Sequence, residues 1–139
     1  MSEDFVVDNS VVMAWCFKDE TSQYADFVLE KLYEVKTFVP SIWPLEVVNV
    51  LLVAERRNRL SQTDSIRFLT LLSQLPIVVE YVPSVIMMKE LLLLARANNL
   101  SSYDASYLDL AMRKGFPLAT LDDNLIRSAR SVDVPILEC

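Results

Sequence analysis

Residues 5–10, FVVDNS, are a short apolar run that ends abruptly in an acid, Asp8. Similar β-rich runs recur along the chain, and the stretches between them repeat apolar residues at helical spacing. Strands that alternate with helices favour right-handed crossovers and a parallel sheet. For 139 residues without a linker or an internal repeat, the expected fold class is α/β, with a single domain over residues 1–139.

Five strands and six or seven helices would account for this pattern. The strands are expected at residues 5–7, 37–39, 77–82, 118–121 and 134–137. The helices are expected from about 22, over 41–57, from 61, over 84–98, from 101 or 102 to 114, and over 122–130. Ser22, Ser61 and Ser84 are plausible N-caps, and Gly115 should stop the helix that precedes it.

The composition narrows the possible chemistry. The chain has no histidine, which excludes a Ser-His-Asp triad, a Cys-His pair and His-ligated zinc. The two cysteines, Cys16 and Cys139, are too few for a disulfide framework or a Cys-based zinc site. The net charge of −6 disfavours a general nucleic-acid binder, but a cation held by acids reverses the local sign. If the protein is an enzyme, carboxylates that bind a hard metal ion are its most natural catalytic groups.

The sequence also bears on the cellular compartment. The first residues, MSEDFVVD, lack the basic region of a signal peptide, and no apolar run is long enough to span a membrane. Free thiols fit a reducing environment. A soluble, cytoplasmic protein is therefore expected.

Acids stand where the expected strands end or where the neighbouring helices begin. They are Asp8, Glu46, Asp104, Asp122 and Asp123. In open parallel sheets, ligands bind beyond the carboxyl ends of the strands. The topology can therefore bring these distant acids together at one edge of the sheet.

Each acid alone has an ordinary structural explanation. Asp8 could be a turn residue at a strand end, and Glu46 could complement a helix dipole. Asp104 and Asp123 could each complete a capping box that begins three residues earlier. A functional site is favoured only if several of these acids converge.

Two details favour convergence. Asp104 is in line with Leu108 and Ala111, on the apolar side of its helix, where a simple solvated cap would not need to be. Glu46 shares a helix face with Asn49 in a stretch that is otherwise apolar, so both polar groups should need partners.

Four short motifs, in order along the whole chain, carry a family resemblance. VVDNSVVMAW (6–15) has an acid at a strand end with a serine two residues on, and PLEVVNVL (44–51) has Glu-x-x-Asn on a helix. SSYDASYLDLA (101–111) has an acid at the start of a Leu/Ala-rich helix, and LATLDDNL (118–125) has Thr-x-Asp after a strand. Together they resemble the PIN domain, and most closely the VapC-type toxins of toxin–antitoxin modules.

The resemblance implies a three-layer α/β/α fold with a five-stranded parallel sheet, and a ribonuclease that depends on Mg²⁺ or Mn²⁺. It assigns catalysis and metal binding to Asp8, Glu46, Asp104 and Asp122. Asp122 takes the fourth place because it completes Thr-x-Asp with Thr120, while Asp123 stays an alternative. Ser10 and Asn49 match the polar companions of the family's acids.

The implied reaction is cleavage of an RNA phosphodiester by metal-activated water, which leaves 5′-phosphate and 3′-hydroxyl ends. The implied partners are the RNA substrate, a second copy of the chain and a cognate antitoxin. The helix at 45–54 is apolar nearly all round, and with Ile66, Leu69 and Leu72 it could form a groove for an amphipathic helix. Dimerisation is a competing use of the same surface.

Other polar residues have simpler expected roles. Asp109 and Glu80 are expected to be surface charges, and Trp15 and Cys16 to be packing residues. Basic residues near the site could contact RNA, although each is better explained alone as a solvated helix-end charge. These candidates are Lys18, Arg56, Arg57, Arg59, Arg113, Lys114, Arg127 and Arg130.

Two other functional classes are weaker. A phosphatase of the haloacid dehalogenase type needs Asp-x-Asp after its first strand, where this chain has DNS at 8–10. A receiver domain needs an acid after its third strand, where this chain has VPS at 82–84. The main alternative is a catalytically silent PIN scaffold that binds RNA or protein, and retention of all four acids argues against it.

Overall fold

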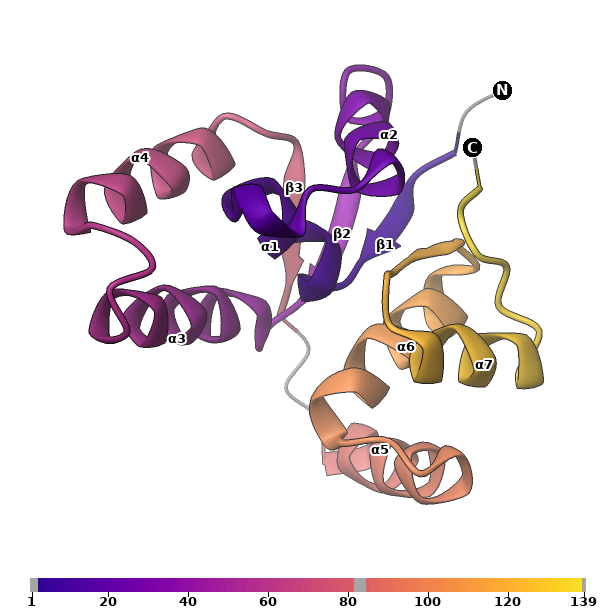
Figure 1. Cartoon of the computed structure of the whole chain (residues 1–139). Helices are drawn as coiled ribbons and strands as arrows, with labels where there is room; N and C mark the ends of the chain where they lie inside the picture. Colours follow the sequence, from indigo (N-terminus) through magenta and orange to yellow (C-terminus); the bar gives the residue numbers. More distant parts are fainter. Residues whose placement is uncertain (1–2, 82–84, 139) are drawn as a thin grey trace.

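The chain folds around a parallel sheet (Figure 1). The structure, a computed structural model, describes residues 3–81 and 85–138. Over these residues the sheet has four strands: β1 Phe5–Val7, β2 Thr37–Pro40, β3 Ile77–Glu80 and β4 Leu118–Ala119. Their order is β3-β2-β1-β4, and all three neighbouring pairs are parallel. The expected α/β class with a parallel sheet is confirmed.

The expected fifth strand at residues 134–137 is wrong. This segment makes a single parallel bridge, between Leu118 and Ile136. Two backbone hydrogen bonds accompany it, from Leu118 N to Pro135 O and from Leu137 N to Leu118 O, each of 2.9 Å. β4 has only two residues, and Pro135 has no N–H to donate, so the ladder cannot extend.

Seven α-helices and one short 3₁₀-helix accompany the sheet in the described part of the chain. They are α1 Asn9–Cys16, η1 Lys18–Glu20, α2 Gln23–Lys31, α3 Trp43–Arg56, α4 Gln62–Ser73, α5 Val85–Asn98, α6 Ser102–Lys114 and α7 Asp123–Ser131. Figure 1 shows α3 and α4 as an arm on one side of the sheet, with α5 next to α6 at the far end. No helix in residues 3–81 and 85–138 has the length and apolar character to cross a bilayer.

The helix ends follow local sequence signals. The side chain of Ser22 accepts a hydrogen bond as the N-cap of α2, Ser61 opens a full capping box on α4, and Ser101 caps α6. Gly115 ends α6 in the left-handed region with φ of 68°, where a side chain would be strained. The expected cap at Ser84 lies outside the described residues.

Helix α1 was not expected, because the spacing of apolar residues predicts the first helix only from about residue 22. Its start is signalled by Asp8, whose side chain caps the helix. The four residues Val11–Ala14 are all buried, so this short helix has no amphipathic period to reveal it. Together with the fully buried β1, α1 forms the centre of the core.

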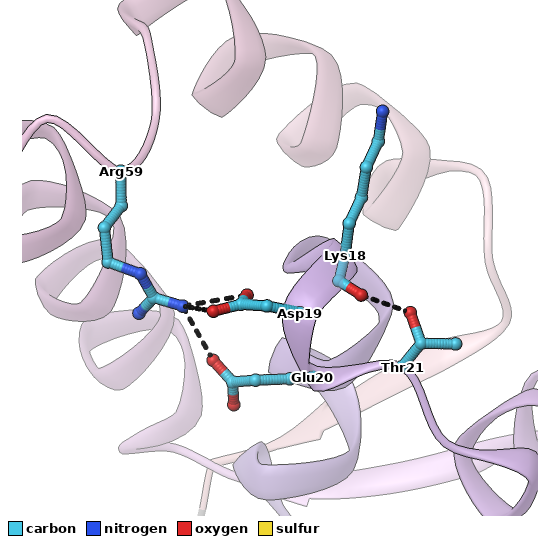
Figure 2. A network of polar contacts seen from close by, with 5 residues as sticks. All are labelled: Lys18, Asp19, Glu20, Thr21 and Arg59. Carbon is cyan, nitrogen blue, oxygen red and sulfur yellow. Dashed lines mark hydrogen bonds and ion pairs between the residues drawn. The ribbon is translucent and has the colours of Figure 1, made fainter.

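Arg59, in the loop between α3 and α4, connects this loop to η1 (Figure 2). Its Nη2 donates to Asp19 at 3.1 Å and to Glu20 at 3.2 Å, and the guanidinium lies 4.1 Å from the ring centroid of Phe17. Exposed ion pairs of this kind contribute little to stability because solvent screens them. Their structural effect is to hold the loop after α3 against the body, which leaves Arg59 less available for RNA.

Asp109 and Glu80 are not the free surface charges that we expected. Asp109 is buried and accepts a hydrogen bond of 2.8 Å from Arg113 Nε. Arg113 Nη1 also donates to Glu80 at 2.7 Å, and Lys114 Nζ lies 3.3 Å from the same carboxylate. Helix α6 packs against both α5 and the sheet, so more than one of its faces is buried and Asp109 must be paired.

Candidate active site

Asp8 is the centre of a buried hydrogen-bond cluster at the carboxyl end of β1. Asp8 is buried, with 4% of its surface exposed. Oδ1 accepts from Ser10 Oγ at 2.6 Å and from the backbone N–H groups of Ser10 and Val11, and Oδ2 accepts from Thr120 Oγ1 at 2.6 Å. Burial raises the pKa of Asp8 to about 6, against the lowering effect of these hydrogen bonds.

Ser10 and Thr120 also connect β1 to the segment after β4. The hydroxyl of Ser10 accepts a hydrogen bond of 3.0 Å from Leu121 N. The hydroxyl of Thr120 accepts one of 2.9 Å from Asp122 N. Both hydroxyls donate to Asp8, and two of these hydrogen bonds, Thr120 to Asp8 and Leu121 N to Ser10, join the two strand ends.

Asp122 and Asp123 have different environments. Asp122 is the N-cap of α7, with Oδ1 accepting 3.1 Å from Leu125 N, and its charge raises the pKa of Asp104. Asp123 is exposed in the first turn of α7. The charge of Asp122 therefore acts on Asp104, while Asp123 is exposed, and the choice of Asp122 as the fourth acid stays a prediction. The structure also removes the capping-box explanation, since Thr120 points to Asp8 instead.

Glu46 comes from the first turn of α3 and is half-buried. Tyr107 Oη donates a hydrogen bond of 2.5 Å to its Oε1. Burial raises the pKa of Glu46, the Tyr107 hydrogen bond opposes the rise, and the charge of Asp104 adds to it. Burial, the bond to Glu46 and the nearby acids in turn raise the pKa of Tyr107 far above its usual value, so the hydroxyl stays a donor.

Asp104, in the first turn of α6, interacts electrostatically with each of the other three acids. Burial and the charge of Asp122 raise its pKa. Its own charge contributes to the raised pKa values of Asp8 and Glu46. Four separate elements thus bring Asp8, Glu46, Asp104 and Asp122 into one interacting set at the carboxyl edge of the sheet.

Asn49 does not join this set. It is exposed on α3, one turn after Glu46, so water can satisfy its amide. The need for a partner that the sequence indicates is thus met by solvent, and the role of Asn49 as a companion of the acids stays a prediction.

The donor set fits a hard divalent cation. Within residues 3–81 and 85–138 no group of three or more acids or thiols is arranged to hold a metal ion by itself. Mg²⁺ does not need such a group, since it is commonly held by one or two carboxylates together with waters and a phosphate. Carboxylates whose pKa values are raised by burial and by each other are relieved by such a charge.

Sequence reasoning missed Tyr107. It lies in the same motif as Asp104, three residues later and therefore on the same side of α6. The signal was a hydroxyl on a helix face that is otherwise apolar, which predicts a buried polar partner.

Comparison with solved structures identifies the same fold elsewhere. PAE2754 from Pyrobaculum aerophilum has a TM-score of 0.69 and 23% identity, over 92% of this chain and 87% of that chain. VapBC2 from Rickettsia felis bound to a DNA fragment from its promoter has a TM-score of 0.69 and 12% identity, over 96% and 97%. FitAcB from Neisseria gonorrhoeae has a TM-score of 0.62 and 16% identity, over 96% of both chains.

Sequence comparison is more specific about the family. No curated protein is significantly similar to this chain. The PIN domain family, however, matches residues 5–131, which include all four acids and every strand of the sheet. The chain belongs to the PIN domain family.

Proposed function

We propose that this PIN domain is an endoribonuclease that requires Mg²⁺ or Mn²⁺. PIN domains are generally nucleases. The observation that carries the proposal is a set of four carboxylates from four elements. Three of them, Asp8, Glu46 and Asp122, interact electrostatically with the fourth, Asp104. The direct test is cleavage of RNA by the purified chain with and without Mg²⁺ or Mn²⁺, with 5′-phosphate ends on the products. A stable RNA complex without cleavage would favour the silent scaffold.

The side chains divide the work. Asp8, Glu46, Asp104 and Asp122 would hold the cation, directly or through water. When bound, a divalent ion lowers the pKa of a water molecule and offsets the negative charge of the phosphate. Ser10 and Thr120 keep the Asp8 carboxylate in one orientation through their 2.6 Å hydrogen bonds. Asp122 is oriented by the first turn of α7, and Glu46 by Tyr107.

The metal-free site should be sensitive to pH. The pKa of Asp8 is about 6 in the folded chain against 3.8 for an ordinary aspartate. The folded state thus binds more protons than the unfolded state between these values, so stability without metal falls as the pH rises through this window. At pH 7 the Asp8 carboxylate is mostly charged and can bind a cation, whereas at pH 5, below its pKa, protons compete with the cation.

Added Mn²⁺ or Mg²⁺ should therefore raise the melting temperature at pH 7, and less so at pH 5. Binding to the folded state alone stabilises by about 2.7 kcal/mol at a hundredfold excess over Kd. Scanning calorimetry at both pH values measures the effect. In the double variant Asp8→Asn/Asp104→Asn the rise should vanish, and an equal rise there would show that the cation binds elsewhere.

We further propose that the chain is the toxin of a toxin–antitoxin pair, with an antitoxin as its protein partner. The structural relatives VapBC2 and FitAcB are toxin–antitoxin complexes. A pocket of about 320 Å³ between α3 and α4 supports an apolar partner segment, since none of its lining residues is charged. The lining residues are Trp43, Pro44, Val47, Val48, Leu69, Leu72, Ser73, Leu75 and Ile77. An amphipathic helix fits such a groove.

A homodimer is the remaining proposal. It is supported by α5, none of whose residues is buried although most are apolar. Contiguous exposed apolar faces mark interaction surfaces. Val85, Ile86, Met88, Leu92 and Leu93 are its large exposed side chains. Light scattering at micromolar concentration should give twice the 15.9 kDa of one chain, and a monomer mass would contradict the dimer.

A further inference from the structure

The Tyr107 side chain links α6, the helix that carries Asp104, to Glu46 on α3. It is 1% exposed and lies one turn after Asp104 on α6, yet its hydroxyl reaches α3. Oη donates 2.5 Å to Glu46 Oε1, over 61 positions of sequence. We infer that Tyr107 is a positioning residue for divalent-cation binding: it holds the Glu46 carboxylate in place and leaves Oε2 for the cation. This inference rests on the metal-dependent function proposed above.

The other acids show why Glu46 needs such a partner. Asp8 is oriented by hydrogen bonds from Ser10, Val11 and Thr120. Asp122 is oriented as the N-cap of α7. Glu46 has a longer side chain with more rotamers to lose, and among the described residues Tyr107 is its one hydrogen-bond donor.

The same geometry separates the hydroxyl from the ring. The ring of Tyr107 belongs to the core, next to Leu108 and Leu110 in the buried stretch of α6. A phenylalanine keeps the ring and removes only the donor. Partners that orient a metal-binding side chain typically change metal affinity or activity about 10- to 100-fold when removed.

The test is a titration of the full-length chain with Mn²⁺, in which the electron paramagnetic resonance signal reports the free ion. Tyr107→Phe should raise the dissociation constant for Mn²⁺ roughly 10- to 100-fold. The matched control is Tyr103→Phe, which removes a hydroxyl from an exposed position one turn earlier on the same helix. The control should bind Mn²⁺ as the unmodified chain does.

A double-mutant cycle distinguishes positioning from a general loss of packing. Glu46→Gln removes the charge that Tyr107 orients, so adding Tyr107→Phe to it should cause little further loss of Mn²⁺ affinity. A full further loss in that background would overturn the inference, because the hydroxyl would then act through the fold. Unchanged Mn²⁺ binding by Tyr107→Phe would overturn it while leaving the proposed function intact. Failure of the unmodified chain to bind Mn²⁺ would overturn both.

Discussion

Asp8→Asn should reduce metal-dependent RNA cleavage by at least about 10³-fold, since a metal site contributes several kcal/mol to transition-state stabilisation and each 1.36 kcal/mol is tenfold in rate. Asparagine is nearly isosteric and is as good an N-cap as aspartate, so its Oδ1 can still accept from Ser10 and Val11 at the start of α1. The substitution removes the charge and keeps the helix. Single-turnover cleavage of a labelled RNA measures the loss.

The matched control for this substitution is Asp26→Asn. Asp26 is an exposed acid in the first turn of α2, away from the four acids. Cleavage by this variant should equal that of the unmodified chain. A folded Asp8→Asn variant that still cleaves RNA at the original rate would rule out the proposed site, and the search for the nuclease centre would have to move elsewhere on the molecule.

Leu69→Arg should abolish the inhibition of RNA cleavage by the proposed protein partner. Leu69 is 36% exposed and lines the uncharged pocket between α3 and α4. When the partner binds, a guanidinium at this position would lose its hydration without forming an ion pair with an acid. Disruption of a central interface residue typically costs about 2–4 kcal/mol of binding free energy, which is roughly a 30- to 1000-fold loss of affinity. Co-expression with the product of the neighbouring gene, followed by purification and a cleavage assay, measures both binding and inhibition.

Thr70→Arg provides the control for the groove variant. Thr70 is the next residue on α4, is exposed, and is absent from the pocket lining. It introduces the same charge on the same helix but outside the groove, so the partner should still bind and inhibit. Equal capture of the partner by Leu69→Arg and Thr70→Arg would show that the groove is not the docking site.

The sequence predicts the framework of the site well, for physical reasons. Asp8 follows β1 directly and Asp122 comes shortly after β4, and the carboxyl ends of parallel strands lie at a common edge. Asp104 was placed correctly by its alignment with Leu108 and Ala111, both of which are buried. The hydrogen bonds that hold the acids could not be predicted in the same way, because the Thr120–Asp8 contact joins residues 112 positions apart.

The errors have equally specific causes. Helix α1 was missed because Val11–Ala14 are buried in succession, which leaves no polar face to count. The fifth strand failed because Pro135 cannot donate and β4 is too short to pair further. Asp109 was misplaced because a mid-helix acid was assumed to face solvent, although α6 is buried on more than one side.

Helix α5 gives the isolated chain an uneven local stability. Its 14 residues are apolar for the most part, none is buried, and its packing is mainly against α6. Segments that bury little area open locally at much lower free energy than the core. In an isolated chain the amide hydrogens of α5 should exchange with solvent far sooner than those of α1. Because α6 has its own cap at Ser101, opening of α5 leaves the helix that carries Asp104 intact.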